Sequence, residues 1–497
     1  MGSLAVRSIY SGGCSANPSN LEFGPRASKY AVGCLPDVKF ELPASWAGQI
    51  PLSNTTNDEL FFWLFEAEHQ DQSDNLIIWL NGGPGCSSLD GLTKENGPLH
   101  FPADSSTPSA NPYSWTKLAN VLYIDQPVGT GYSGGSDEAT LNSQVTQDFS
   151  AWLGAFYDVF TGLSSKNTYI MGESYAGIYI PYFTQALMQN DHNLSVNIKA
   201  ISIGDGTFGN GAALTDVGTT TYLVEQANIL HISSEIVDVF KKADRDCGFA
   251  KALRQASYPP KGKIKIPNDP EGNNFRARSK RQSTGNNGCL PNPDTAALVS
   301  KSIKTCNKSP GQCSACATYD TALNYLNSTR QCFNPYNILY NCTNTPTITP
   351  FVTYLNKPAV RIAIHAPNKT YADCNSTILD TLTQEFVIPP AYSIMPALID
   401  RGIKIHVYSG NFDLDLNHQG AELVLQNMTW GGKQGFQKKP KNKFLVDGLN
   451  AGNWGFERNL SYHRILHAGH VVPYDNPAAA FAYVKDFVVG DTGYHKS

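Results

Sequence analysis

The sequence predicts an α/β fold: a doubly wound, mostly parallel sheet interrupted by an inserted, disulfide-rich cap region. Four short apolar runs, at 75–85, 119–131, 168–174 and 198–206, end in turn-forming residues, and each is typical of a buried parallel strand that feeds a loop. Between the second and third runs, residues 145–160 carry apolar side chains at helical spacing. Strand, helix and strand in this order predict right-handed β-α-β units.

The composition of the chain changes after residue 207. Residues 208–391 are rich in Cys, Asn, Pro and Lys and show few strong periodicities, whereas a helix followed by a strand is expected at 391–413. We therefore expect the core to consist of two parts, residues 1–207 and 392–497, with residues 208–391 as the insertion.

The bulk properties exclude several classes of protein. The 497 residues are 41% hydrophobic and 16% charged, which is a globular balance. The net charge is −4 and the basic residues are mostly dispersed, so nucleic acid is not an expected partner. The longest strongly apolar run, LFFWLF at 60–65, is far below the roughly 18 residues that span a bilayer, so we expect a buried strand there and no membrane segment.

The cysteines indicate an oxidising compartment. The chain has eleven, and seven of them fall between residues 247 and 342, a density that favours disulfides. Cys313-Ser-Ala-Cys316 could belong to a zinc site, but no second such pair follows, so no metal and no other cofactor is expected. The pairing of the seven clustered cysteines cannot be read from the sequence.

Potential N-glycosylation sites support the same compartment. The first ten residues lack the apolar core of a signal peptide, so a secreted or vacuolar location is inferred from the cysteines together with these sites. Nine Asn-x-Ser/Thr sequences occur, at Asn54, Asn193, Asn307, Asn327, Asn341, Asn368, Asn375, Asn427 and Asn459.

The segment Gly172-Glu-Ser-Tyr-Ala176 has the form of a nucleophile elbow. In this turn a serine lies between a strand and a helix, and small residues two positions away on either side avoid backbone clashes. The apolar run at 168–171 precedes Ser174, and one apolar helical face follows it, so the required context is present. A serine at the start of a helix is more often only a cap, but this context favours a nucleophile.

A nucleophilic serine needs a base and an acid, and both follow in the chain order Ser, Asp, His. Asp413 ends a predicted strand, and His470 follows the last apolar run. Asp415 and His467 lie so near to them in the chain that spacing alone does not choose within either pair. Asp205, which also follows a strand, is a further candidate for the acid.

Four blocks of sequence resemble the serine carboxypeptidases, a branch of the α/β-hydrolase fold with fungal secreted and vacuolar members. They span nearly the whole core and read WLNGGPGCSSLDG at 79–91, LYIDQPVGTGYS at 122–133, GESYAGIYIP at 172–181, and SGNFD at 409–413 followed by HAGHVVPYDNP at 467–477. The resemblance implies that Ser174 is the nucleophile, His470 the base and Asp413 the acid that orients the imidazole. It also implies that the backbone N–H groups of Gly83 and Tyr175 form the oxyanion hole.

The resemblance further implies that the substrate is the C-terminus of a peptide or protein. Its free carboxylate is expected to be recognised by Trp79, Asn81, the backbone of Gly82, Glu95 and Glu173. Two neighbouring carboxyl groups cannot easily both ionise, so they share a proton, and a protonated carboxyl can donate a hydrogen bond to the substrate. We therefore expect cleavage to be favoured at acidic pH.

Finer expectations concern the substrate pockets and two disulfides. Asp90, Lys94 and Val471 are expected near the pocket for the leaving residue. Asp415 is expected at the pocket for the residue before the scissile bond, where a carboxylate would favour Arg or Lys. The family pattern implies the bridge Cys86–Cys374, and Cys14–Cys34 is a plausible second one.

Two other functions remain open from the sequence. A relative with the same triad could act as an acyltransferase or esterase, and a non-catalytic glycoprotein could bind peptides without turnover. The set Asn81, Glu95 and Glu173 favours peptide hydrolysis over acyl transfer, and the complete triad argues against the non-catalytic alternative. The sequence does not predict an oligomeric state.

Overall fold

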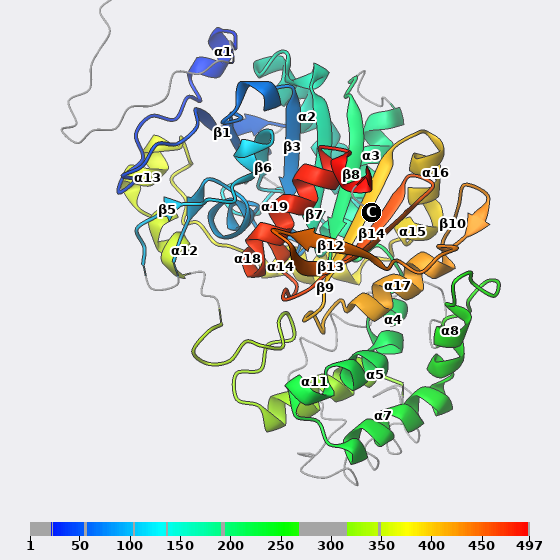
Figure 1. Ribbon diagram of the computed structural model, residues 1–497. Helices are drawn as coiled ribbons and strands as arrows, with labels where there is room; N and C mark the ends of the chain where they lie inside the picture. The colour runs from blue at the N-terminus through cyan, green and yellow to red at the C-terminus, as the bar shows by residue number, and fades with distance from the viewer. Residues whose placement is uncertain are drawn as a thin grey trace, which may run out of the picture.

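A ten-stranded sheet forms the centre of the computed structural model, which describes residues 21, 23–53, 57–102, 105–135, 138–189, 194–267, 316–345 and 349–495. The strand order is β1-β2-β6-β3-β7-β8-β9-β14-β13-β12 (Figure 1). The strands are β1 (Ser45–Pro51), β2 (Glu59–Phe65), β3 (Asn75–Leu80), β6 (Asn120–Ile124), β7 (Asn167–Glu173), β8 (Ile198–Gly204), β9 (Lys404–Gly410), β12 (Asn442–Val446), β13 (Leu449–Glu457) and β14 (Leu460–Ile465).

The centre of the sheet is parallel and its edges are antiparallel. Parallel pairing links β6, β3, β7, β8, β9 and β14, whereas β1 and β2 on one side and β13 and β12 on the other pair antiparallel. The predicted mostly parallel α/β sheet is thereby confirmed. The strand expected within 119–131 ends at Ile124. Pro127 follows, and it has no backbone N–H to continue a ladder.

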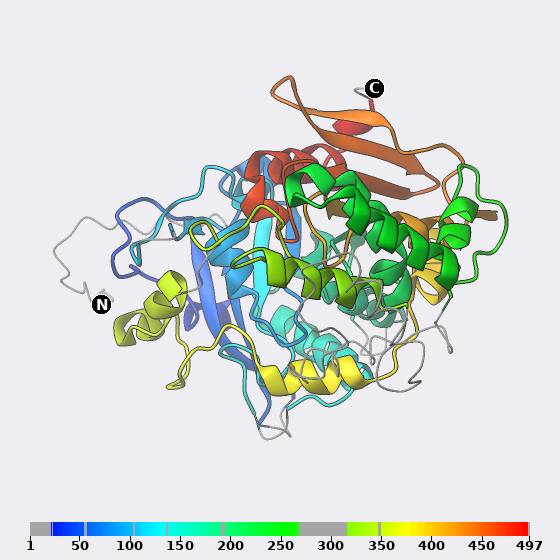
Figure 2. The same ribbon diagram turned by 90° about the horizontal axis from the view of Figure 1, so that it is seen from below.

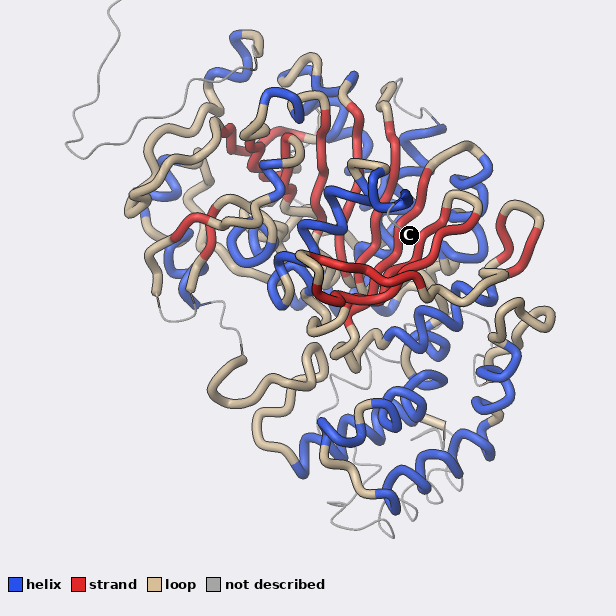
Figure 3. Tube along the Cα trace, in the orientation of Figure 1, coloured by secondary structure: helices blue, strands red, loops and turns tan. Residues whose placement is uncertain are grey.

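Helices cover both faces of the sheet, as Figure 3 shows. Along β3, Leu76, Ile78 and Leu80 pack into one apolar core, while Ile77 and Trp79 pack into the other. This alternation follows from the two-residue period of a strand. The first core includes residues of α2 (Asn142–Val159) and α3 (Ala176–Gln189), and the second includes residues of α19 (Pro477–Tyr483).

The insertion is helical. Among the described residues every regular element between β8 and β9 is a helix, and Figures 1 and 2 show α4, α5, α7, α8 and α11 gathered on one side of the sheet. The sequence showed few periodicities here because most of these helices are too short to repeat an apolar pattern. They are α4 (Gly211–Leu214), α5 (Asp216–Glu225), α6 (Ala227–Leu230), α7 (Ser234–Cys247), α8 (Phe249–Gln255), α11 (Thr318–Thr329), α12 (Thr349–Leu355), α13 (Pro358–Ala363) and α14 (Ser376–Gln384). Helix α15 (Pro390–Ser393) spans the expected boundary, and α16 (Met395–Asp400) precedes β9 in the second part of the core.

Disulfides tie the insertion together and to the core. Cys247 is bonded to Cys316 and Cys332 to Cys342, within the insertion. Cys86 is bonded to Cys374, the bridge that the family resemblance implies. Cys34 is also disulfide-bonded, but Cys14 lies outside the described residues, so that pairing stays a prediction. The division of the chain at residues 207 and 391 likewise stays a prediction.

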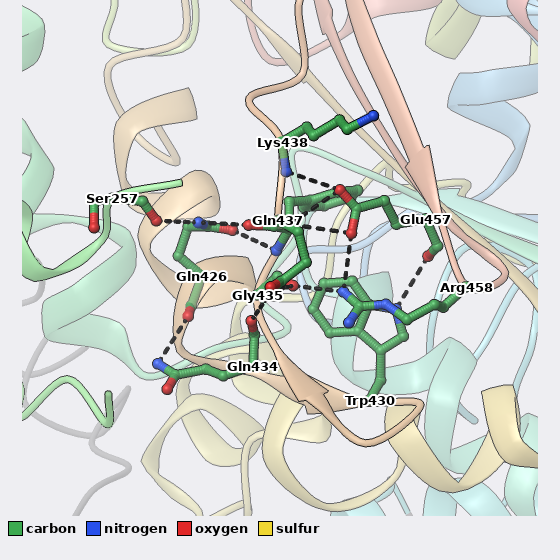
Figure 4. A network of polar contacts seen from close by, with 10 residues as sticks. Ser257, Gln426, Trp430, Gln434, Gly435, Gln437, Lys438, Glu457 and Arg458 are labelled. Atoms are coloured by element: carbon green, nitrogen blue, oxygen red, sulfur yellow. Dashed lines mark hydrogen bonds and ion pairs between the residues drawn. The ribbon is translucent and has the colours of Figure 1, made fainter. Parts of the chain in front are cut away.

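A network of polar contacts joins residues 426–438 to Glu457 and Arg458 at the end of β13 (Figure 4). The Glu457 carboxylate accepts hydrogen bonds from the backbone N–H groups of Gln437, at 3.0 Å, and Lys438, at 2.9 Å. The Arg458 guanidinium lies 4.2 Å from the centre of the Trp430 ring, a cation–π contact. These contacts hold the small hairpin of β10 (Thr429–Trp430) and β11 (Lys433–Gln434) against the turn between β13 and β14.

No helix in the described ranges is long and apolar enough to cross a membrane.

Candidate active site

Ser174 occupies a sharp turn between β7 and α3. Its φ of 59° lies in the left-handed region, which costs a non-glycine residue on the order of 1 kcal/mol or more. Three backbone hydrogen bonds hold it there: Ser174 N donates to Gly204 O at 2.9 Å, and Ser174 O accepts from Gly177 N at 2.9 Å and Thr207 N at 3.0 Å. A side chain at Gly172 would lie 2.1 Å from Leu80 O, which explains the small residue that precedes the turn.

The structure brings His470 and Asp413 together. His470 Nδ1 lies 2.7 Å from Asp413 Oδ2, and both residues are buried. Asp413 Oδ1 accepts from the backbone N–H groups of Asp415, at 2.8 Å, and Leu416, at 3.3 Å. Burial raises the pKa of the Asp413 carboxyl, and the hydrogen-bonded charge of His470 opposes that rise. The contact with Asp413 can orient the imidazole ring of His470 so that its Nε2 atom is available as a base.

The other acid candidates have different partners. The Asp205 carboxylate accepts from Gly410 N, at 3.0 Å to Oδ1 and 3.2 Å to Oδ2. Burial, together with the charge of Asp413, raises the pKa of Asp205 well above its ordinary value. Asp415 Oδ1 accepts a hydrogen bond from the Tyr319 hydroxyl. The remaining histidine candidate, His467, packs edge-on against Phe412, with ring centroids 6.3 Å apart.

Residues 335–338 of the insertion contact both the acid loop and the base. Tyr336 O accepts from His470 N at 2.7 Å, and the Tyr336 ring lies 4.7 Å from the imidazole. Pro335 O accepts from Leu414 N at 2.9 Å, and Ile338 N donates to Phe412 O at 3.1 Å. Sequence analysis missed these contacts, because they depend on backbone groups that carry no side-chain signal.

The expected oxyanion donors lie on two loops that meet. A side chain at Gly82 would come within 2.4 Å of Tyr175 N, so only glycine lets the backbone after β3 approach the elbow this closely. Gly83 has a φ of 103°, which also favours glycine. A buried hydrogen bond anchors the loop after β3, because Ser87 Oγ donates to Asp125 Oδ1 at 2.5 Å. Burial raises the pKa of Asp125 to about 6.

The amide of Asn81 joins two buried carboxyl groups. Its Nδ2 donates to Glu95 Oε1 at 3.0 Å and to Glu173 Oε1 at 3.1 Å. Its Oδ1 accepts from Trp79 Nε1 at 2.8 Å and from Gly91 N at 3.2 Å, which fixes the direction of the amide. Trp79 is fully buried, and its indole N–H holds the carbonyl oxygen of Asn81 in place.

Each carboxyl group of this pair keeps one buried oxygen, Glu95 Oε2 and Glu173 Oε2, that has no other hydrogen-bond partner among the described residues. A proton shared between the two carboxyl groups would give both oxygens a partner, because a protonated carboxyl donates and a carboxylate accepts. Burial and the charge of Asp90 raise the pKa of Glu95 to about 7. Burial and the charge of Glu95 raise the pKa of Glu173 well above its ordinary value. The pair is therefore protonated in acid and holds one or more protons near neutrality.

Two of the expected pocket residues, Asp90 and Lys94, lie close enough for their charges to act on this pair. Lys94 Nζ is 2.9 Å from Asp90 Oδ2. Asp373 lies close to both charges, and burial together with Asp90 raises its pKa to about 8. Val471 is half-buried and directly precedes α18 (Val472–Asp475). Their roles toward a leaving residue stay predictions. Within the described ranges, no group of three or more His, Cys, Asp or Glu side chains is placed to hold a metal ion.

The strand-elbow-helix turn, the parallel sheet and the hydrogen-bonded His and Asp define a serine hydrolase of the α/β-hydrolase class. A family model for serine carboxypeptidases matches residues 36–490. The chain belongs to the serine carboxypeptidase family, and it is a serine-type carboxypeptidase.

Similar proteins agree with this assignment. A carboxypeptidase Y homolog of Arthroderma benhamiae is 39% identical over 486 residues, which cover 94% of each chain. A pheromone-processing carboxypeptidase kex1 of Neosartorya fischeri is 30% identical, over 91% of this chain and 66% of that protein. The crystal structure of Kex1(delta)p, a prohormone-processing carboxypeptidase from Saccharomyces cerevisiae, superimposes with a TM-score of 0.67 at 21% identity, over 95% of this chain and 97% of that one. This last similarity concerns the fold alone.

The buried carboxyl pair predicts that the protein is more stable in acid. The pKa of Glu95 is about 7 in the folded protein and 4.5 as an ordinary value, so the folded state binds the proton more tightly. The stability from this difference is complete below pH 4.5 and is lost as the pH rises through about 7. The unfolding temperature of the wild type, followed by circular dichroism, should fall across this range, and that of Glu173→Gln should fall less.

The exposed Asp380 on α14 offers a matched control, because Asp380→Asn changes a carboxyl group without touching the buried pair. Its unfolding temperature should follow the wild-type pH dependence. Equal slopes for Glu173→Gln and wild type would contradict the shared proton.

Proposed function

We propose that Ser174 attacks the C-terminal peptide bond of a substrate, with His470 as the base and Asp413 as the group that orients the imidazole. The Ser174 proton passes to His470 and then to the leaving amino acid, which departs as the acyl-enzyme forms; water then releases the shortened peptide. The N–H groups of Gly83 and Tyr175 stabilise the oxyanion of each tetrahedral intermediate. The 2.7 Å contact between His470 and Asp413 and the left-handed φ of Ser174 support these roles.

The observation that carries the exopeptidase assignment is the Asn81 amide between Glu95 and Glu173. Glu173 directly precedes Ser174, so a group bound by this pair lies next to the nucleophile. A protonated carboxyl donates a hydrogen bond to the carboxylate of the substrate, and a negatively charged pair would repel it. Peptide binding is therefore favoured in acid.

Peptide binding should weaken as the pH rises through about 7, the pKa to which Glu95 is raised. The KM of a peptide should increase over that range. The KM of the same peptide with a C-terminal amide should stay nearly constant, because the amide carries no charge for the pair to recognise. Steady-state kinetics of both substrates between pH 4.5 and 8 measure this difference, and parallel curves would rule out recognition by the pair.

Ser174→Ala is the control for the reaction itself. When peptides are incubated with the wild type and followed by mass spectrometry, they should lose residues one at a time from the C-terminus. They should remain intact with the variant. Shortening that persists in Ser174→Ala would exclude Ser174 as the nucleophile.

We further propose that Asp415 favours a basic residue before the scissile bond. Asp415 lies two residues after Asp413 and is 8% exposed. Its side chain is close enough to Asp413 for its charge to act on the catalytic acid. Asp415→Leu should lower the ratio of kcat/KM for Arg over Leu at that position about tenfold, the loss of one charged hydrogen bond. Tyr319→Phe removes the hydroxyl that contacts Asp415 but keeps the charge, so it should retain the preference. An unchanged ratio in Asp415→Leu would contradict this role.

The location that fits these features is the secretory pathway or the vacuole. The three disulfides that the structure describes are typical of an oxidising compartment. Asn327, Asn341 and Asn368 have exposed side chains that can carry a glycan, whereas Asn427 is half-buried and pairs with both backbone groups of Ile264. Asn375 is also half-buried, and Asn54, Asn193 and Asn307 lie outside the described residues.

Glycans at the exposed sites would be visible in the mass of the protein isolated from its source. Enzymatic removal of N-glycans should lower that mass, and glycopeptide analysis should locate sugar at Asn327, Asn341 or Asn368. Asn427 should be unmodified, because its amide nitrogen donates to Ile264 O at 3.0 Å. A mass unchanged by the treatment would contradict passage through the glycosylating compartments.

A further inference from the structure

Residues 373–385, here called the α14 segment, contact both loops that carry the proposed oxyanion donors. The N-terminal end of the segment contacts the loop after β3. The C-terminal end contacts the start of α2 and the side chain of Tyr175. The two donors themselves, Gly83 and Tyr175, are far apart in the chain and share no strand. Their loops follow the paired strands β3 and β7, so their relative position depends on this pairing and on the segments that hold each loop.

The first end of the segment is joined to the loop after β3 by covalent and backbone bonds. Cys374 is bonded to Cys86, Ser87 N donates to Asp373 O at 2.7 Å, and Asn375 N donates to Gly85 O at 2.9 Å. Ile378 packs over Gly85, where an added side chain would lie 2.9 Å from it. This end thus restrains residues 85–87, which directly follow Pro84 and lie two to four residues after Gly83.

The last end of the segment reaches Tyr175 through a chain of hydrogen bonds. Glu385 Oε2 accepts from Asn142 N at 2.5 Å and from Asn142 Nδ2 at 2.7 Å. Asn142 Oδ1 in turn lies 3.2 Å from the Tyr175 hydroxyl, which donates to it. The same hydroxyl is 3.2 Å from Leu382 O, so its single proton has two acceptors on this side. Asn142 and Tyr175 are both buried.

The charge of Glu385 sets the direction of the Asn142 amide. A carboxylate accepts hydrogen bonds only, so it takes the NH₂ group of Asn142 and leaves the carbonyl oxygen pointing at Tyr175. A hydrogen bond to a carboxylate is about twice as strong as one between neutral groups, which favours this orientation over the flipped one. If the amide flipped, its carbonyl oxygen would face the Glu385 carboxylate, and two acceptors would meet.

We propose that Glu385 is a positioning residue for the oxyanion hole. Through Asn142 it fixes the Tyr175 side chain and hence the N–H of Tyr175, while the other end of the same segment fixes the loop that carries Gly83. The proposal rests on the roles given above to Gly83 and Tyr175. Glu385 is half-exposed and follows the last residue of α14, so it can be replaced without opening the apolar core.

Glu385→Ala should lower kcat with little change in KM, because the oxyanion is present in the transition state and absent from the bound substrate. Removal of an oxyanion donor costs about 100- to 1,000-fold in kcat, so a displaced donor is expected to cost about tenfold. The loss should be equal for a peptide and for an ester substrate, since both pass through the same intermediate. The affinity for a peptide aldehyde, which forms a tetrahedral adduct with the serine, should fall in parallel. Glu385→Gln keeps an acceptor oxygen and should recover most of the activity.

Two controls separate positioning from a general loss of structure. Gln384→Ala changes the exposed neighbouring residue and should behave as wild type. Titration of reactive serine with a fluorophosphonate gives kcat per active site, so a fraction of unfolded protein does not count as a loss. Asn142→Ala should reproduce the effect of Glu385→Ala, and the double variant should show no further loss, because the two residues act through one path.

Several outcomes would overturn the proposal: an unchanged kcat per active site in Glu385→Ala, a KM that rises while kcat is unchanged, or additive losses in the double variant. If Glu385→Ala does not fold, the same comparison between Glu385→Gln and Asn142→Ala decides the question. A failure of the proposed function is recognised separately, because Ser174→Ala would then retain activity whatever Glu385 does.

Discussion

Strands β3 and β7 lie side by side and parallel, and the arrangement of the site depends on this adjacency. Leu80 pairs with Gly172, so the two strands end together and their loops leave the same edge of the sheet. Asn81 therefore meets Glu173, and the backbone of Gly82 meets the N–H of Tyr175. Glycine at positions 82 and 172 allows this close approach. A side chain at Gly82 would lie 2.4 Å from Tyr175 N, and one at Gly172 would lie 2.1 Å from Leu80 O at the end of β3.

Burial gives the carboxyl groups at this edge their chemistry. A carboxylate removed from water without a countercharge is costly, so the pKa rises until a proton is retained. Glu95 and Glu173 share the Asn81 amide as a donor, and the charge of Lys94 lowers both pKa values, but burial is the largest cause and both shifts are upward. Asp413 differs because His470 and two backbone N–H groups favour its charged form. Similar side chains thus serve as a proton-sharing pair in one place and as an orienting acid in another.

The features that could be predicted from the sequence are those encoded locally. The strand, the Gly172-Glu-Ser-Tyr-Ala176 turn and the following helix were predictable because strand and helix periods and small residues lie within about twenty positions of Ser174. Spacing alone left Asp205, Asp413 and Asp415 open as acids, since all follow strands that end at the same edge. The choice of Asp413 came from the family resemblance, and its carboxylate is the one that contacts His470. The Glu385–Asn142 contact joins residues 243 positions apart, and the sequence carries no sign of it.

The disulfide Cys332–Cys342 joins two residues ten positions apart, and the segment that contacts both Phe412 and His470 lies between them. Helices α5, α7 and α11 also pack into one apolar cluster with Phe412 and Leu414, the two neighbours of Asp413. One residue added between Pro335 and Ile338 would shift the carbonyl groups that meet the acid loop and the base, and would change catalysis while leaving the sheet intact.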